Sequence, residues 1–316
     1  MSGGASADHF RPHRRLRTLA GPIFGAACLL ATLTGVVVLA VLMLAIVAAA
    51  LSGGPEAGAF DVGGAARELA SLLGRLVSGR QSSDPARAGY HAGVVSSLWL
   101  LGLTAAIGIP AGVGAGVFLE EYMPAGRLRR IIQTNIANLA GVPSVVYGIL
   151  GLALFVRAFG VPGLALGPSL LAGALTLSLL ILPTIVITTQ EALRTVPPSL
   201  RQAALALGAT RWQVVSGHVL PAALPGIMTG TILGLSRAIG ETAPLLMVGA
   251  AGSLLRAPRG PLDRYTALPV EIYNYAKEPD RAFQPVAAGG ILILVALLLT
   301  MNAVAIVIRN RFRRRR

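Results

Sequence analysis

The sequence predicts an all-α integral membrane protein, a helical bundle with six transmembrane helices. Of its 316 residues, 54% are hydrophobic and only 13% are charged, a composition too apolar for a soluble domain of this length. The mean hydropathy is +0.70. Six segments reach the roughly 20 apolar residues that a helix needs to cross a bilayer. They are 21–49, 92–118, 132–156, 168–189, 222–250 and 286–308.

The chain begins with a basic tail, residues 1–18, which leads into a long apolar run at 19–51. A signal peptide also starts with basic residues, but its apolar region is much shorter. We therefore expect an uncleaved first transmembrane helix. Cys28, the one cysteine of the chain, lies in this run and can form no disulfide within the chain.

Basic residues are distributed unequally between the two sides of the predicted bundle. The loops and ends on the N-terminal side carry sixteen arginines, whereas the opposite side carries ten basic residues over much longer loops. The positive-inside rule then places both termini of a multi-pass protein of the cell (inner) membrane in the cytoplasm. The C-terminal tail, residues 309–316, is expected to contact acidic membrane lipid. Because the arginines gather on no single face, nucleic-acid binding is not expected.

Two long loops lie on the predicted extracytoplasmic side. The first, 52–89, starts with many glycines and continues with four leucines at helical spacing: Leu69, Leu72, Leu73 and Leu76. This pattern fits an interfacial helix and equally fits a partly disordered loop. The second loop, 251–285, combines proline with mixed charge, and we expect an ordered cap or docking surface there.

Three prolines inside the predicted spans are candidates for helix kinks. Pro143 is in the third, Pro183 in the fourth and Pro244 in the fifth. A proline inside a helix removes a backbone hydrogen bond and kinks the helix, and membrane bundles tolerate this where neighbours satisfy the freed carbonyl. We expect kinks at all three positions, in a packed membrane core that covers 90–308.

A stretch with polar edges, 197–221, separates the fourth and fifth apolar segments. Pro197 and Pro198 end the preceding helix. Two pairs have the spacing of capping boxes, Ser199 with Gln202 and Thr210 with Gln213. Four residues share one face of a short helix: Leu200, Ala203, Ala204 and Leu207. Gly208 stands where a helix C-terminal glycine is expected. Such a helix could transmit the motion of a partner or could simply connect two spans.

Arg237 and Glu241 are charged residues inside the fifth apolar segment. If this segment enters the bilayer near Gly226, about eleven residues at ~1.5 Å each place Arg237 roughly 16 Å deep. A spacing of four puts both side chains on one helix face, where they can pair. An ion pair at this depth marks either a substrate pathway or a structural contact between helices. The planar fork of an arginine suits an oxyanion, and Glu241 could orient the arginine or favour a protonated oxyanion.

The sequence lacks the motifs of the common enzyme and metal sites. It has neither a Gly-x-x-x-x-Gly-Lys-[Ser/Thr] phosphate loop nor a Gly-x-Ser-x-Gly elbow. Its four histidines have no metal-ligand spacing. We therefore expect a protein that is not an enzyme, that uses no cofactor or metal, and that does not itself bind and hydrolyse ATP.

The motif Gln202-Ala203-Ala204, followed by Gly208 and Leu220-Pro221, resembles the EAA loop of ABC importer permeases. Two departures are Gln202, where that family usually has glutamate, and His218, where it usually has isoleucine. The run Arg237-Ala-Ile-Gly-Glu241-Thr-Ala-Pro-Leu-Leu246 resembles the phosphate permeases of the PstA type. Further similar stretches are 140–148, 182–186, 191–194 and 268–275, within a resemblance that runs from about Tyr90 to Arg309.

This resemblance implies a first helix followed by a five-helix core of the MetI-like, type I importer class, with a cytoplasmic coupling helix. It implies three kinds of partner: a PstC-type permease subunit in a heterodimer, a dimer of ATP-binding subunits, and an extracytoplasmic phosphate-binding protein. Alternating access would carry phosphate past Arg237, Glu241 and Thr242. The residues that would contact the ATPase are Ser199, Gln202, Ala203, Ala204, Leu207, Gly208, Thr210 and Arg211.

Three alternatives to this assignment remain open at the level of sequence. The first is a permease for another oxyanion, such as sulfate or molybdate. The second is an ion-coupled secondary carrier that works without an ATPase. The third is an additional signalling role, in which the subunit reports phosphate status through its partners.

Overall fold

The structure, a computed structural model, describes residues 14–51, 62–158, 161, 163, 165–254 and 256–314. Parts of the predicted tails and of the 52–89 loop therefore lie outside the described residues. Every regular element of the described part is helical, in agreement with the predicted all-α class. Met1–Ala48 form one compact unit and Ala49–Arg316 form a second.

The first unit contains most of α1, Arg14–Leu51. Its segment Phe24–Leu51 has a mean hydropathy of 2.8 and is long enough to cross a membrane. A helix therefore forms where the sequence predicts the first transmembrane segment.

Four further helices of the described residues are long and apolar enough to span a membrane. They are α3 (His91–Val117) with its continuation η1 (Phe118–Tyr122), α6 (Leu170–Arg194), α9 (Leu220–Gly240) with the preceding α8 (Arg211–Val214) and η4 (Val215–Val219), and α12 (Gln284–Arg314). With a bent helix pair counted as one span, the described part of the chain has six. This number agrees with the six transmembrane helices predicted.

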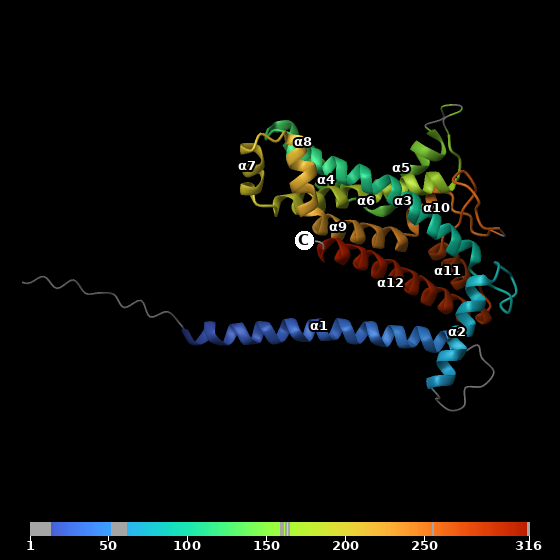
Figure 1. Cartoon of the computed structure of the whole chain (residues 1–316). Helices are drawn as coiled ribbons and strands as arrows, with labels where there is room; N and C mark the ends of the chain where they lie inside the picture. Colours follow the sequence, from blue (N-terminus) through green and yellow to red (C-terminus); the bar gives the residue numbers. More distant parts are fainter. Residues whose placement is uncertain are drawn as a thin grey trace, which may run out of the picture. The chain divides into compact units, whose positions relative to one another are not determined.

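α6 lies at the centre of the second unit and packs against α3 and α9 (Figure 1). Its apolar window is 67% buried, against 39% for α3 and η1. Three glycines of α3 face α6: Gly108 contacts Ile181, Gly112 contacts Ile185 and Gly116 contacts Thr189. Because a glycine has no side chain, two membrane helices can approach closely along such a row. Pro183 lies inside α6, which continues through it as one helix of 25 residues.

The third predicted span is broken in the structure. α4 (Arg127–Ala140) and α5 (Ser144–Gly151, continued by η2, Leu152–Val156) meet at an angle of 104°. Pro143 has the extended backbone of an N-cap residue, with φ −56° and ψ 138°. The prediction of one helix over 132–156 with a kink at Pro143 was therefore wrong. Gly141 and Pro143 end one helix and start another, because neither residue favours a helix interior.

Two helices outside the spans cover one end of the unit, α2 (Val62–Ser78) and α11 (Leu268–Ala276). The leucines of α2 have protein neighbours: Leu76 is buried, and Leu72 and Leu73 pack on the same cluster, which includes residues of α11 and α12. The alternative of disorder is thus wrong for 62–78. The loop 251–285 is ordered in its described part, as predicted, and contains α11 and the short helix η5 (Arg281–Phe283).

Candidate functional site

Arg237 and Glu241 lie where α9 ends. The helix stops at Gly240, Glu241 has an extended backbone with ψ 116°, and a new short helix, α10 (Ala243–Val248), begins after Thr242. The prediction of a continuous helix over 222–250 that bends at Pro244 was wrong. Pro244 occupies the first turn of α10, where its missing N–H leaves no helical hydrogen bond unmade. Arg237 therefore lies in the last turn of α9, before a break in the span, and Glu241 lies in the break itself.

The predicted pair of Arg237 and Glu241 does form. Arg237 Nε donates to Glu241 Oε1 at 3.3 Å. The side chains are 43% and 20% exposed, respectively, so the guanidinium is accessible. Among the described residues, its two Nη groups have no hydrogen-bond partner. The arginine therefore retains the donors that can bind an oxyanion as a fork.

The break beside Arg237 packs against the other broken span. α10 lies on α5, and a Cβ at Gly148 would come within 2.6 Å of Pro244 Cα. Any larger residue at position 148 would push the two segments apart. The hydroxyl of Tyr147 donates to the Leu139 carbonyl at 2.8 Å, which connects α5 back to α4 across its own break. Broken helices that meet in this way are typical of transporter substrate pathways.

The coupling stretch forms a short helix, α7 (Pro198–Ala206). Pro197 occupies its N-cap position without a side-chain cap, so the predicted capping box of Ser199 with Gln202 is wrong. The second box is confirmed: Thr210 Oγ1 accepts from the Gln213 backbone and Gln213 Oε1 accepts from the Thr210 backbone. The first box fails because the chain enters the helix through two prolines, which need no cap.

Gly208 ends α7 as predicted. Its φ is +83°, a left-handed conformation that glycine adopts without strain. The Gly208 N–H donates to the Leu205 carbonyl and the Ala209 N–H donates to the Ala204 carbonyl, at 2.9 and 3.2 Å. These are the two bonds of a Schellman motif. They terminate α7 and direct the chain towards α8.

The surface of α7 and α8 is apolar and largely uncovered. Of the predicted face, only Ala204 is buried, whereas Leu200 and Ala203 are exposed and Leu207 is 90% exposed. Trp212 is also exposed, as are Gln202 and Arg211. We call the exposed side chains of Leu200, Leu205, Leu207 and Trp212 the coupling surface. Several large exposed apolar residues on a short helix are typical of a surface that contacts another protein or the membrane.

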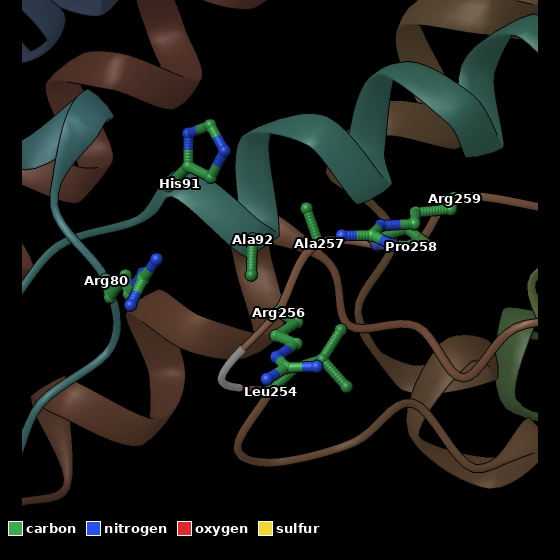
Figure 2. A pocket seen from close by; sticks show the side chains of 8 residues that line it. All are labelled: Arg80, His91, Ala92, Leu254, Arg256, Ala257, Pro258 and Arg259. Carbon is green, nitrogen blue, oxygen red and sulfur yellow. The ribbon is translucent and has the colours of Figure 1, made fainter.

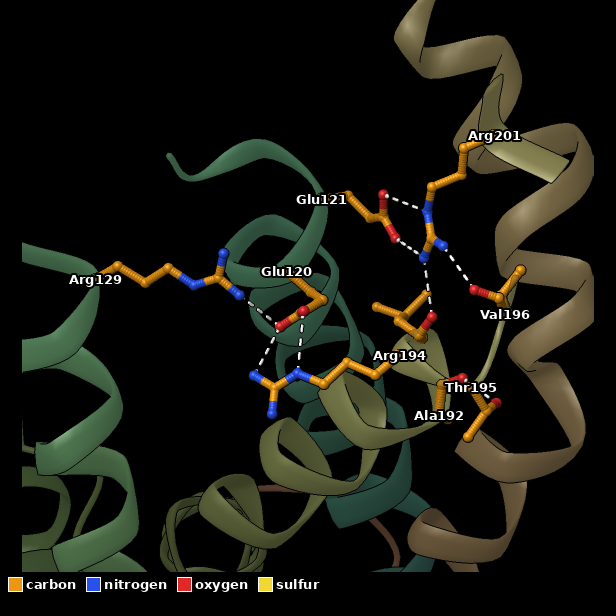
Figure 3. A network of polar contacts seen from close by, with 9 residues as sticks. Glu120, Glu121, Arg129, Ala192, Arg194, Thr195, Val196 and Arg201 are labelled. Atoms are coloured by element: carbon orange, nitrogen blue, oxygen red, sulfur yellow. Dashed lines mark hydrogen bonds and ion pairs between the residues drawn. The ribbon is translucent and has the colours of Figure 1, made fainter. Parts of the chain in front are cut away.

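Charged side chains tie this helix to the ends of the spans (Figure 3). Glu120, in η1, accepts from Arg129 of α4 at 2.7 Å and from Arg194 of α6 at 3.0 Å. Its neighbour Glu121 accepts from Arg201 of α7 at 2.7 Å. Arg201 also donates to the carbonyls of Val196 and Leu193, at 2.8 and 2.9 Å. One acidic pair thus connects α4, α6 and α7.

Comparison with known proteins identifies the family. The family described as "Binding-protein-dependent transport system inner membrane component" matches residues 108–316. The chain belongs to this family. It is 34% identical to "Probable ABC transporter permease protein YqgI" of Bacillus subtilis over 75% of this chain and 83% of that protein. It is 38% identical to "Phosphate transport system permease protein PstA 1" of Mycobacterium tuberculosis over 72% of each. The resemblance to PstA-type permeases is confirmed.

A solved structure supports the fold of the permease. An inward-facing MetNI methionine ABC transporter chain matches with a TM-score of 0.55, 21% identity, and coverage of 73% of this chain and 99% of that chain. At this identity the likeness concerns the fold alone. It confirms the predicted MetI-like architecture.

Sequence reasoning did not find the acidic pair at the end of α3. Glu120 and Glu121 follow the predicted second span, 92–118, and the arginines were counted among the loop residues on the N-terminal side. Two adjacent carboxylates between an apolar segment and the basic cluster Arg127 to Arg130 were the available signal of an ion-pair network. The pairing itself depends on the packing of α3, α4 and α6, which the sequence does not give.

A second residue that the sequence analysis missed is Glu271 in α11. Its side chain is completely buried, no described side chain pairs with its carboxylate, and the backbone N–H of Gly93 lies beside it. It lies against Gly93 of α3, where any Cβ would overlap the carboxylate. Burial raises the pKa of the Glu271 carboxyl to about 8. The permease therefore has a protonatable group at the contact of α11 with α3.

Proposed function

We propose that this protein is the membrane permease subunit of an ATP-driven importer of inorganic phosphate. It forms half of the translocation pathway together with a second, PstC-type permease. Its membership of the permease family and its similarity to PstA proteins support this proposal. The single observation that carries it is the Arg237–Glu241 pair at the break between α9 and α10.

Arg237 is the residue that binds the anion in this scheme. A phosphate that leaves water loses its hydration, and a guanidinium replaces it with two parallel N–H donors and a positive charge. The contact of Nε with Glu241 orients the planar guanidinium and leaves its two Nη groups free to donate to an anion. Since an arginine charge within a span is expensive unless it is paired, the glutamate also lowers the cost of its placement.

Glu241 supplies selectivity. Near neutral pH, phosphate still carries at least one O–H group, whereas sulfate carries none. An ionised carboxylate can only accept hydrogen bonds. Glu241 therefore favours an oxyanion whose O–H group donates a hydrogen bond to the carboxylate and repels one that has no such group. Thr242, the next residue along the chain, presents a hydroxyl that can serve as donor or acceptor.

The coupling surface is where the ATP-binding subunits dock. Leu207 and Trp212 supply exposed apolar area, and Gly208 and the Thr210 cap hold α7 and α8 in a fixed relation. Closure of the ATPase dimer would displace α7, and the Arg201–Glu121 contact would pass this displacement to α3. Both termini are then cytoplasmic, and the phosphate-binding protein docks at the opposite ends of the spans.

Reconstitution of the complete importer in proteoliposomes tests the proposal. We expect uptake of labelled phosphate that requires ATP and both permease subunits, and that resists excess sulfate or molybdate. Because an arginine can bind any tetrahedral oxyanion, competition by sulfate or molybdate at concentrations similar to phosphate would favour the other-oxyanion permease. Uptake by the purified chain alone, without an ATPase, would contradict the proposal and indicate a secondary carrier.

A further inference from the structure

A cavity of about 490 Å³ opens where α3 begins (Figure 2). This end of the second unit lies opposite α7 and its coupling surface (Figure 1). The cavity begins at His91 and Ala92 in the first turn of α3, which η1 continues to Glu120 and Glu121. The other walls come from Arg80, between α2 and α3, and from the loop between α10 and α11. That loop contributes Leu254, Arg256, Ala257, Pro258 and Arg259. The lining therefore combines three arginines and a histidine with no acidic residue.

The positive charge of this cavity is not neutralised within the described structure. The side chains of Arg80, Arg256 and Arg259 are exposed, and no described residue forms an ion pair or a hydrogen bond with them. Of two nearby carboxylates, Asp84 is paired outside the lining, and Asp263 is bonded to the backbone of the lining loop but forms no ion pair with a pocket arginine. Asp84 pairs with Arg87 at 3.7 Å, and Asp263 accepts the backbone N–H groups of residues 259 and 260 at 2.8 and 2.9 Å. A concave surface of one sign attracts and concentrates counter-ions.

The backbone that carries the arginines is held in place. Gln81, next to Arg80, donates to the Gly252 carbonyl at 3.0 Å and accepts from the Leu254 backbone at 2.9 Å. Asn274 of α11 donates to the same Gly252 carbonyl at 2.8 Å. These contacts join the segment before α3 to the loop after α10. Two of the three segments that line the cavity are thus bonded to each other. This bonding limits the reorganisation needed for a ligand to bind.

We propose that this cavity, which we call the outer arginine pocket, binds orthophosphate before the ion reaches Arg237. This inference rests on the proposed function, which places the pocket on the extracytoplasmic side. Guanidinium groups recognise tetrahedral oxyanions through paired N–H donors, and the first turn of α3 adds the positive end of a helix dipole. A cavity of this volume holds a small anion with water. The site captures phosphate released from the binding protein and raises its local concentration at the entrance.

The test is a phosphorus NMR titration of inorganic phosphate with the assembled importer in nanodiscs, without the binding protein. Arg256→Gln and Arg80→Gln keep a polar side chain and remove the charge. We expect each to weaken phosphate binding by about tenfold. Arg87→Gln, a nearby exposed arginine outside the pocket, is the matched control and should bind as the wild type does. Arg237→Ala removes the inner anion site, so it should lose transport but keep the part of the phosphate binding that depends on Arg80 and Arg256.

Other outcomes separate the pocket from the proposed function. If the pocket variants bind phosphate normally but lose affinity for the purified binding protein, the arginines receive acidic side chains of that partner, and the proposal is overturned. Unchanged phosphate binding and unchanged capture of the binding protein would also overturn it. In both cases ATP-driven phosphate uptake by the wild type would leave the proposed function intact. Preferential uptake of sulfate, by contrast, would contradict the proposed function.

Discussion

Arg201 Nη2 lies 2.7 Å from Glu121 Oε1, so the short helix α7 is bonded directly to the end of η1, the continuation of α3. The side chains are only 23% and 10% exposed, and the arginine also holds two carbonyls at the end of α6. Water competes weakly with a partly buried contact of this kind. A displacement of α7 is therefore transmitted to both α3 and α6 through the Arg201 side chain.

Replacement of Arg201 by alanine is expected to uncouple the importer. It removes hydrogen bonds from a charged group, a loss of about 1.5–3 kcal/mol, and it leaves Glu121 without a partner. We expect ATP hydrolysis to continue while the phosphate carried per ATP falls. Arg201→Lys should not restore coupling, because a lysine cannot form the same fork of contacts. The matched control is Arg194→Ala, since Arg194 is 53% exposed and Glu120 keeps Arg129. An unchanged ratio of uptake to hydrolysis in Arg201→Ala would contradict this role.

Leu207→Asp is expected to detach the ATP-binding subunits. Leu207 is 90% exposed in the single chain, and burial of a leucine side chain at an interface contributes about 1.5–3 kcal/mol. The association should weaken by roughly ten- to a hundredfold, measured by co-purification of the ATPase with the permease. Leu262→Asp changes a leucine that is also exposed but lies in the loop beyond α10. Equal effects of the two substitutions would show that the coupling surface has no special role.

Glu241→Gln is expected to relax the choice of oxyanion. The amide can donate a hydrogen bond where the carboxylate only accepts, so sulfate should compete with phosphate uptake more strongly than in the wild type. The affinity for phosphate should fall less than the selectivity. Glu191→Gln, an exposed position at the end of α6, serves as the control. The same sulfate inhibition in the wild type and in Glu241→Gln would assign Glu241 to the orientation of Arg237 alone.

Glu271 predicts a pH dependence of stability. Its pKa rises from an ordinary 4.5 to about 8 because it is buried. Between these values the folded chain holds a proton that the unfolded chain has lost, so the free energy of unfolding decreases as the pH rises through this window. Glu271→Gln mimics the protonated form. We expect it to raise the thermal midpoint at pH 8 to 9 and to leave it nearly unchanged near pH 4.5. A thermal midpoint of Glu271→Gln that equals the wild-type value at every pH would contradict the burial of Glu271.

The parts of the fold that follow from composition could be predicted from the sequence. Apolar length indicated six spans, and the short helix near Gly208 followed from local turn chemistry. The breaks at Pro143 and Glu241 could not be predicted, because a proline in an apolar segment fits a kink as well as a break. The difference depends on Gly148, which lets α10 pack on α5, and such a contact is not visible in either segment alone.

Only the part of the candidate site that depends on local spacing could be predicted from the sequence. Arg237 and Glu241 are four residues apart, so their pairing follows from local geometry. Glu120 and Arg194 are 74 positions apart, and the residues of the outer arginine pocket come from three segments. The sequence shows their charges, but only the packing of α3 against α6 and the bonded loops bring them together.

Arg237 is expected to bind phosphate on its way through the membrane. The direct measurement is ATP-dependent uptake of labelled phosphate by the complete importer, with Arg237→Ala compared with Arg87→Ala in equal amounts of assembled complex. We predict that Arg237→Ala abolishes uptake while the complex still assembles and hydrolyses ATP, and that Arg87→Ala transports normally. Uptake at the wild-type rate by Arg237→Ala would reduce the pair to a structural contact and contradict the account.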